Sequence, residues 1–569
     1  MSKRLSFSVF LKIILIAVLL MGGFVFYPST TAVSGEIEKN FGDHLKSLSP
    51  DEFVSAIVIL ANQADIKTLN EELKMEKATR KERHRRVISA LMEVADRSKG
   101  DITSYLNTKK RDGAVRGYTH FWIMNLVVIE AQRSEIEKIA ARSDVQWIEP
   151  NFQASLIKPV GERDPKESSK GIGVTPGLRA INAPRVWHEL GYTGLGRILS
   201  SIDTGVDKTH PALSGRWRGN HEPWRECWRD CLGYGDTIPH DYNDHGTHVM
   251  GTMTGLGVST GDTIGVAWQA EWINDNAINQ NTGTAFDNDI LDAFQWIADP
   301  DSNPNTVDDV PDVCQNSWGI DHRFSGYQDC DNRWQTVIVN CEAAGVVVTF
   351  SAGNEGPAAQ TNRSPANNCT TPVTNFSIGA VNATSYNWPY PIADFSSRGP
   401  SDCDITKKKP EVVAPGVTVY SSVPGGGYQQ NGWDGTSMAG PHVAGVVVLM
   451  RQANPDLDVD SIKHILMNTA RDEGAFGEDN NYGWGFIDAY AAVLAVVNGM
   501  FLAGDANRDS LVDIADVIFL TNYLYKSDVA PTPKAAGDVN ADCIVDVADV
   551  VYLINYLYKS GPAPVKGCA

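Results

Sequence analysis

The sequence has no surplus of positive charge, no zinc-type cysteine pairs and, after its N-terminal segment, no long apolar run. Its 569 residues hold 49 Lys and Arg against 69 Asp and Glu, a formal net charge of −20. Such a chain lacks a broadly cationic face for phosphates, which disfavours nucleic acid as a partner. No later segment reaches the ~18 consecutive apolar residues of a membrane span, so we expect no membrane partner after processing.

The nine cysteines do not form a zinc motif, and no H-E-x-x-H pattern is present. An odd count leaves at least one thiol free or paired with another chain. Short separations favour pairing Cys227 with Cys231 and Cys330 with Cys341, although sequence alone does not fix connectivity.

The N-terminus predicts export. Lys3 and Arg4 precede a mostly apolar stretch from Ile13 to Tyr27, followed by small and hydroxyl residues. This is the order of a secretory signal, which we assign to residues 1–32. The alternative is a membrane anchor, but the apolar stretch is short for one. We therefore expect a secreted protein, in a compartment where disulfides can form.

Three regions that differ in sequence pattern follow the signal. Residues 50–156 contain β-type runs and charged helical stretches, and residues 157–174 form a polar connector open to cleavage. Residues 175–497 alternate short apolar runs with helical stretches, which predicts an α/β domain with a parallel sheet. The expected elements are strands at 54–60, 121–129, 145–148, 198–202, 313–315 and 345–350, and helices at 71–95, 134–141 and 245–256.

Four motifs in the central stretch indicate nucleophile chemistry. ILSSIDTGVD places Asp203 at a strand end, HGTHVMG places His245 at a helix start, and DGTSMAGPHVAG places Ser437 at a Gly-rich turn. A serine nucleophile needs a base to take its proton, and that base needs a carboxylate to fix its tautomer. VVVTFSAGNEG adds Asn354, whose amide can donate to a developing oxyanion.

In this order, the four motifs resemble those of the subtilisin-like serine proteases, near the bacillopeptidase F-like branch. The resemblance implies a parallel sheet flanked by helices and an acyl-enzyme mechanism that needs no cofactor. It implies that Asp203 orients the base, His245 is general base and acid, Ser437 is the nucleophile and Asn354 is the oxyanion donor. It also implies a backbone edge on which a protein or peptide substrate pairs as a strand, formed by Ser317, Trp318 and Gly319.

The chain departs from that pattern at two informative positions. Asp244 stands before His245 where relatives have Gly, and a carboxylate facing the ring would raise the pKa of the imidazole. Ala212 replaces an Asp that ligates calcium in many relatives, which leaves calcium in the catalytic domain open. His248 and His442 also lie in the motifs, and we interpret both as structural because the nucleophile needs one base.

The first stretch resembles the inhibitor-type propeptide of the same family, a small open α+β sheet with two helices. The resemblance implies a folding assistant and intramolecular inhibitor, whose tail occupies the cleft after self-cleavage within residues 157–174. The alternative is a permanent accessory domain.

The last stretch, residues 498–569, repeats with an offset of 33 residues. Ile514–Ser527 matches Val547–Ser560 at 10 of 14 positions. Each repeat opens with oxygen ligands at the spacing of a calcium loop, including the carbonyl at position 7. The alternative is two solvated acidic turns. The candidate ligands are Asp505, Asn507, Asp509, Leu511, Asp513 and Asp516, and Asp538, Asn540, Asp542, Ile544, Asp546 and Asp549.

These repeats resemble a type I dockerin, an all-α domain with two calcium-loop repeats. The resemblance implies two calcium ions and a cohesin-type partner on a scaffold or cell surface. Position 6, usually Gly, is Ser510 or Cys543. Positions 10 and 11, which help select the partner in dockerins, are Ile514-Ala515 and Val547-Ala548.

We therefore expect a secreted serine endopeptidase, made as a self-processed zymogen and tethered through its dockerin. One alternative is a catalytically silent protease fold that binds partners on a cohesin scaffold. Another is that the last domain contributes only stability.

Overall fold

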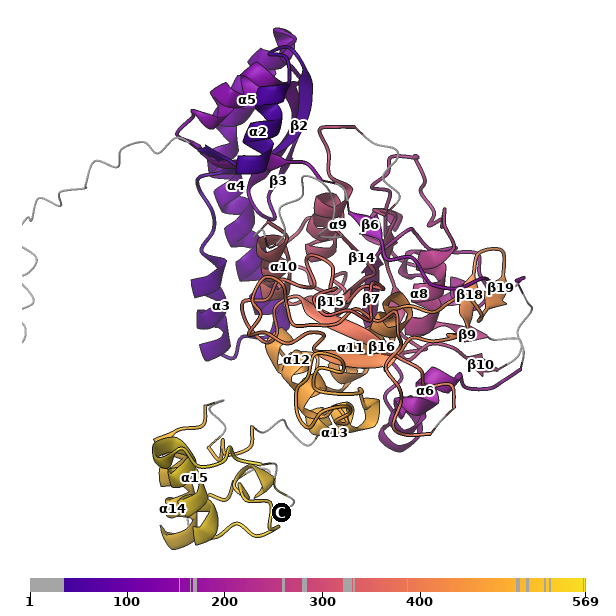
Figure 1. The fold of residues 1–569 in the computed structure, drawn as a ribbon, viewed down its shortest axis with the longest axis vertical. Helices are drawn as coiled ribbons and strands as arrows, with labels where there is room; N and C mark the ends of the chain where they lie inside the picture. The colour runs from indigo at the N-terminus through magenta and orange to yellow at the C-terminus, as the bar shows by residue number, and fades with distance from the viewer. Residues whose placement is uncertain are drawn as a thin grey trace, which may run out of the picture.

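The computed structural model (Figure 1) describes residues 35–567 apart from short gaps, and the predicted signal segment 1–32 lies outside them. In the part described, no helix is both long and apolar enough to cross a bilayer. The gaps are residues 153, 164, 167–170, 258–260, 279–283, 321–329, 331–332, 386, 498–501, 508–510, 527–528, 532–533 and 566.

The N-terminal domain is a five-stranded sheet with the order β1-β5-β2-β4-β3. It begins before residue 50, because β1 already pairs parallel with β5. The domain carries four helices rather than the expected two, because residues 39–47 and 66–75 form helices of their own in addition to those at 80–111 and 133–140. The bounds are β1 Glu36–Ile37, α2 Lys39–Ser47, β2 Phe53–Leu60, α3 Ile66–Met75, α4 Arg80–Arg111, β3 Val115–Phe121, β4 Leu126–Gln132, α5 Arg133–Ala140 and β5 Val145–Pro150.

The single strand expected at 121–129 is wrong, because a hairpin turn divides it. β3 and β4 pair antiparallel on either side of Trp122–Asn125, where Asn125 takes a positive φ of 43°. The turn is apolar because it is buried against the next domain: the Asn340 side chain donates to the Ile123 carbonyl at 2.7 Å. Hydrophobicity at this turn therefore reports an interface rather than a strand.

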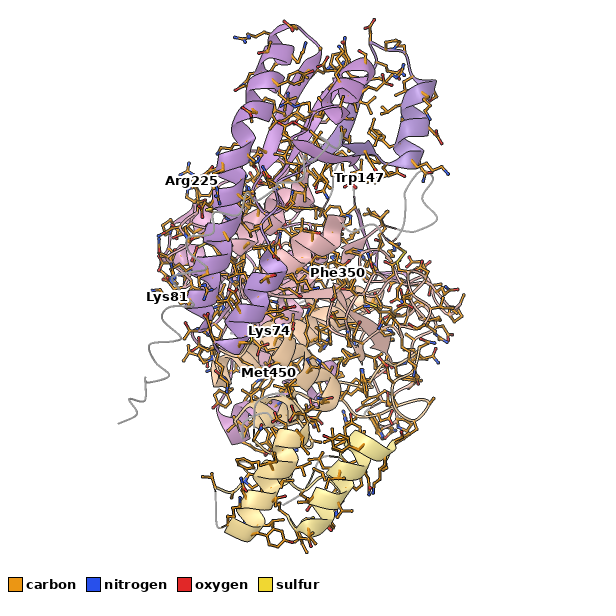
Figure 2. The ribbon with its side chains drawn as sticks, turned by 90° about the vertical axis from the view of Figure 1, so that its left-hand side faces the viewer. Lys74, Lys81, Trp147, Arg225, Phe350 and Met450 are labelled. Carbon is orange, nitrogen blue, oxygen red and sulfur yellow. A yellow bond between two sulfur atoms is a disulfide. The ribbon has the colours of Figure 1, made fainter. Side chains whose placement is uncertain are left out.

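Helix α4 links the two domains. Its 32 residues span about 48 Å at 1.5 Å per residue. Figure 2 shows α4 running from the N-terminal sheet down the side of the central domain, with Lys74 and Lys81 alongside that domain. Lys74 of α3 forms an ion pair with Asp460 of the central domain. The N-terminal domain is thus held at its sheet and at the far end of α4.

The central domain confirms the expected α/β parallel sheet. Six strands lie in the order β11-β7-β13-β15-β16-β17, and every pair is parallel. The strands β7, β13, β15 and β16 are buried throughout, as expected for a sheet covered on both faces. Their bounds are β7 Ile198–Ile202, β11 Glu271–Trp272, β13 Val313–Asn316, β15 Val347–Ser351, β16 Phe376–Val381 and β17 Val412–Pro415.

Helices α8 and α11 pack against each other and against this sheet, while α9 and α10 pack together beneath the N-terminal domain. The helix bounds are α6 Pro176–Ala180, α7 Ala183–Arg185, α8 His245–Thr254, α9 Asp289–Ala298, α10 Arg333–Ala343, α11 Thr436–Ala453, α12 Val459–Asn468 and α13 Ala489–Val497. Short paired strands are β6 Ser155–Leu156, β8 Trp228–Arg229, β9 Leu256–Gly257, β10 Asp262–Thr263, β12 Asn274–Asp275, β14 Trp318–Gly319, β18 Ser421–Val423 and β19 Gly427–Gln429.

The disulfide pairs favoured by short spacing are wrong. Cys330 pairs with Cys403, 73 residues away, with a Cα–Cα distance of 5.4 Å. Cys227, Cys231 and Cys341 are free and buried in the core. Short spacing does not predict pairing here, because these three side chains pack as small apolar groups instead.

The last domain is helical, as expected. Helices α14 (Ile514–Lys526) and α15 (Val547–Lys559) pack through Val517, Leu520, Val550 and Leu553. Cys543, at loop position 6, adopts a φ of 69°, the conformation for which Gly is usual. Cys543 is itself disulfide-bonded.

Candidate active site

Asp203 lies directly after the buried strand β7, at the carboxyl edge of the sheet. Its side chain is fully buried, and Oδ1 accepts the Thr204 backbone N–H at 2.8 Å. The same oxygen lies 2.7 Å from Nδ1 of His245. A buried carboxylate at this distance fixes the tautomer that leaves Nε2 free to accept a proton.

His245 opens α8, and its position depends on two glycines. A Cβ on Gly246 would stand 2.0 Å from the Gly205 carbonyl oxygen, so a larger residue would push the imidazole away from Asp203. Within the described residues, Nε2 of His245 is buried and makes no hydrogen bond. This leaves it available as a base.

Asp244 precedes the base in a left-handed conformation with a φ of 74°, which explains why Gly suits this position. Its carboxylate pairs with Arg163 at 3.6 Å and Lys166 at 3.5 Å. Both cations belong to the connector. Asp244, which departs from the family pattern, therefore contacts the cations of the connector. The sequence had instead suggested that its carboxylate raises the pKa of the His245 imidazole.

A second buried carboxyl, Asp275, stands near Asp203 and was missed by the sequence analysis. It ends β12, and its Oδ1 accepts the Ala277 backbone N–H at 3.1 Å. Burial raises the pKa of Asp275 well above its ordinary value, and the charge of Asp203 raises it further. Asp275 is therefore held toward its neutral form.

Ser437 lies in the first turn of α11, fully buried, and its Oγ donates to the Ile157 carbonyl at 2.8 Å. The segment before it approaches the base, since the ring centroid of Trp433 is 6.2 Å from that of His245. Trp433 also stacks on His248 with centroids 4.0 Å apart. The structure thus brings the three predicted residues into one region.

The other two motif histidines are buried and neutral. Nε2 of His248 contacts the Val419 carbonyl at 3.0 Å, and burial lowers its pKa well below the ordinary value. His442 contacts the Met438 carbonyl through Nδ1 at 2.9 Å, and burial lowers its pKa to about 4. Both contacts fit the structural role expected for them.

Asn354 lies against the turn that carries Ser437. Its Oδ1 accepts the Thr436 backbone N–H at 2.9 Å and the Thr436 hydroxyl at 3.0 Å. The amide nitrogen is thereby directed outward and donates to the Lys158 carbonyl at 2.9 Å. A Cβ on Gly435 would lie 3.0 Å from this nitrogen, so Gly435 leaves room for the amide.

The predicted substrate edge pairs with the chain's own segment that leads into the connector. Strand β14 pairs antiparallel with β6, matching Trp318 with Leu156 and Gly319 with Ser155. The Ser317 carbonyl accepts the Ile157 N–H at 3.0 Å. The indole of Trp318 points into the core, where it packs against aromatic rings, so only its backbone faces the connector.

Ile157 and Lys158 were not identified as site residues from sequence. The one available signal was the apolar pair Leu156-Ile157, which is followed at once by Lys158-Pro159 at the start of the polar connector. On the far side of Ser437, the Val160 N–H donates to the Asp434 carbonyl at 2.7 Å. An uncut chain therefore crosses the site as an extended strand.

The two calcium loops have a donor set that fits the ion. The position-12 carboxylates, Asp516 and Asp549, are fully buried, as is Asp538. Asp549 accepts the N–H groups of Val539 and Asp546, which folds the loop around it. Asp509 and Ser510 lie outside the described residues. Buried carboxylates of this kind suit a hard divalent cation.

Comparisons with known proteins agree with this geometry. A model described as "Subtilase family" matches residues 194–485, and one described as "Dockerin type I domain" matches residues 503–558. Bacillopeptidase F of Bacillus subtilis (strain 168) is 35% identical over 501 residues, covering 83% of this chain and 33% of that protein. Subtilisin E of the same strain is 31% identical over 319 residues, covering 56% of this chain and 70% of that protein.

Among solved structures, the chain is similar to fervidolysin from Fervidobacterium pennivorans, which is described as a keratinolytic enzyme related to subtilisin. The match has a TM-score of 0.51 and 23% sequence identity, and it covers 78% of this chain and 61% of fervidolysin. This likeness supports the fold. The chain spans about a third of the length of bacillopeptidase F. With the family model matching just over half of its residues, the chain belongs to the subtilase family and carries a type I dockerin domain.

Proposed function

We propose that this chain is a secreted serine endopeptidase with Asp203, His245 and Ser437 as its triad. The observation that carries the proposal is a pair of contacts. His245 lies 2.7 Å from the buried Asp203, and the Ser437 hydroxyl lies on a peptide carbonyl at 2.8 Å. A base oriented by a carboxylate and a serine against a carbonyl are the parts that acyl transfer requires.

In the proposed reaction, Ser437 Oγ attacks the substrate carbonyl carbon as His245 Nε2 takes its proton. The carbonyl oxygen becomes an oxyanion, which the Asn354 amide stabilises. Collapse breaks the C–N bond, and His245 gives its proton to the leaving amine. Water then hydrolyses the acyl-enzyme by the same steps, with His245 again as base. Asp203 remains ionised and stabilises the imidazolium.

The first substrate is the chain's own connector, cut between Ile157 and Lys158. Ile157 is held on both sides, through its N–H to Ser317 and its carbonyl to Ser437. The Asn354 amide donates one residue further, to Lys158, so oxyanion binding requires a shift of this amide toward the Ile157 oxygen. After cleavage, the segment ending at Ile157 remains paired with β14 and inhibits the enzyme. Protein substrates would bind the same edge as extended strands.

A serine-directed organophosphonate separates this function from that of a silent binding protein. Mature enzyme should be labelled at Ser437, and the Asp203→Asn variant should be labelled far more slowly. Equal labelling of both, or none of the wild type, contradicts the triad.

We further propose that the dockerin binds two calcium ions and docks on a cohesin-type module outside the cell. Equivalent positions in the two repeats expose matching apolar side chains: Ile514 and Val547, and Ile518 and Val551, are each about half exposed. Either repeat could therefore present the same surface.

Chelation tests this second proposal. Removing calcium should abolish capture by an immobilised cohesin and leave cleavage of a short peptide unchanged. Capture that survives chelation would instead favour a domain that contributes only stability.

A further inference from the structure

The loop between α9 and β13 gathers three carboxylates on the sheet edge away from Ser437. Asp299, Asp301 and Asp309 place one oxygen each within 4.8 Å of one another. Asp299 and Asp309 are 2% and 3% exposed. Three such groups repel one another strongly at low dielectric unless a cation or protons compensate.

The hydrogen bonds of the loop leave two of these oxygens without partners. Asp309 Oδ2 accepts the Asp301 N–H at 3.0 Å, and Asp299 Oδ1 accepts the Asn303 N–H at 3.1 Å. In the described residues, the other oxygens of Asp299 and Asp309 are buried and unsatisfied. A buried oxygen without a donor is costly, so these two oxygens call for a further partner.

No arginine or lysine of the described chain pairs with the three carboxylates. Arg80, from the first turn of α4, and Arg197 both pair with Asp312 instead, at 3.2 and 3.5 Å. Burial, with the charge of Asp301, raises the pKa of Asp299 to about 7 and that of Asp309 to about 6.

An independent feature faces the same place from the N-terminal domain. His84, one turn after Arg80 in α4, is fully buried, and its Nε2 lies 3.7 Å from Asp299 Oδ1. That distance is too long for a hydrogen bond, and within the described residues both ring nitrogens lack a partner. A buried imidazole without a hydrogen bond therefore lies beside the carboxylate cluster, as a second group that a bound ligand would satisfy.

We propose that Asp299, Asp301 and Asp309 bind a calcium ion in the catalytic domain, at a site that the propeptide helix α4 covers with His84. The donors are hard oxygens, which calcium takes in sets of six to eight. The three carboxylates supply part of such a set, and water supplies the rest of the shell. The ion neutralises the buried charge and holds the loop whose carbonyls, at Val310 and Pro311, accept the Arg80 guanidinium.

Terbium luminescence tests the site in the full chain carrying Ser437→Ala, which keeps the propeptide attached. Terbium replaces calcium, and excitation at a wavelength absorbed only by Trp excludes the dockerin loops, because the dockerin contains no Trp. Trp296, three residues before Asp299, is the nearby sensitiser. Asp301→Asn removes the most accessible ligand, and Asp308→Asn, an exposed neighbour in the same loop, is the matched control.

Asp301→Asn should lose most of the Trp-excited, calcium-displaceable signal, while Asp308→Asn keeps it. Calcium-45 dialysis should find one ion fewer in Asp301→Asn than in Asp308→Asn. Equal signals and equal ion counts would overturn the proposal. If Asp301→Asn does not fold, the terbium titration of the Ser437→Ala chain alone tests the site. A Trp-excited signal that calcium displaces supports the site, and the absence of such a signal refutes it.

Discussion

The end of α4 far from its sheet should be released by a single substitution, Arg80→Ala. The guanidinium is buried, donates to the Val310 and Pro311 carbonyls at 2.9 Å each, and pairs with Asp312 at 3.2 Å. Burial itself lowers the pKa of Arg80, so part of this attraction offsets desolvation. Asp312 also keeps Arg197 at 3.5 Å in the variant. We therefore expect a loss of about 2–4 kcal/mol, toward the lower end of the ~2–5 kcal/mol typical of breaking a buried charge pair.

Hydrogen exchange on the uncut Ser437→Ala chain measures this loss without relying on activity. Amides of α3 and the first turns of α4 should exchange roughly 30- to 1,000-fold faster in Arg80→Ala, since each 1.4 kcal/mol is tenfold. Arg85→Ala is the control, because Arg85 pairs only within α4, with Glu82, at the surface. Unchanged protection in Arg80→Ala, or equal acceleration in both variants, would refute the reasoning.

Three further outcomes follow from the site. Asn354→Ala should lower kcat for a peptide substrate by about 10²–10³ with little change in KM, because its donor acts on the oxyanion; a change confined to KM would contradict this. Asp203→Asn should lower kcat by about 10⁴, since the amide holds the wrong tautomer; near-normal turnover would remove Asp203 from the triad. His442 has a pKa of about 4 in the folded chain and 6.5 in the unfolded chain, so the unfolded chain binds the proton first as the pH falls. The free energy of unfolding should therefore decrease below pH 6.5, by about 3 kcal/mol at pH 4. Thermal melts of His442→Gln should show a smaller acid loss than those of the exposed control His464→Gln, and identical losses would exclude His442 as a cause.

The elements that the sequence predicts well are those whose burial is internal to one domain. Strand β7 has the expected bounds, Ile198–Ile202, because five consecutive buried positions of a parallel strand leave a continuous apolar run. The hairpin at Trp122–Asn125 was missed because its apolar residues pack against another domain. Periodicity cannot separate those two causes of hydrophobicity.

For the site too, features that depend on one segment of the chain are predicted, and contacts between distant segments are not. Motifs predict Asp203, His245 and Ser437 as the triad, because the chemistry restricts the residue types. They do not reveal that Asp244 pairs with the connector, or that Ile157 lies against Ser437, since both contacts join segments that only the fold brings together. The Asp299–Asp309 loop did carry a signal, alternating Asp and Asn residues, but one copy of such a pattern is also typical of a solvated turn.

The most direct test of the proposed mechanism is mass spectrometry of the purified full chain and its Ser437→Ala variant, expressed and incubated side by side. The wild type should yield a mature N-terminus at Lys158 and a propeptide ending at Ile157, while Ser437→Ala stays joined across that bond. Cleavage at the same bond in Ser437→Ala, or a wild type that remains intact while correctly folded, would contradict the account.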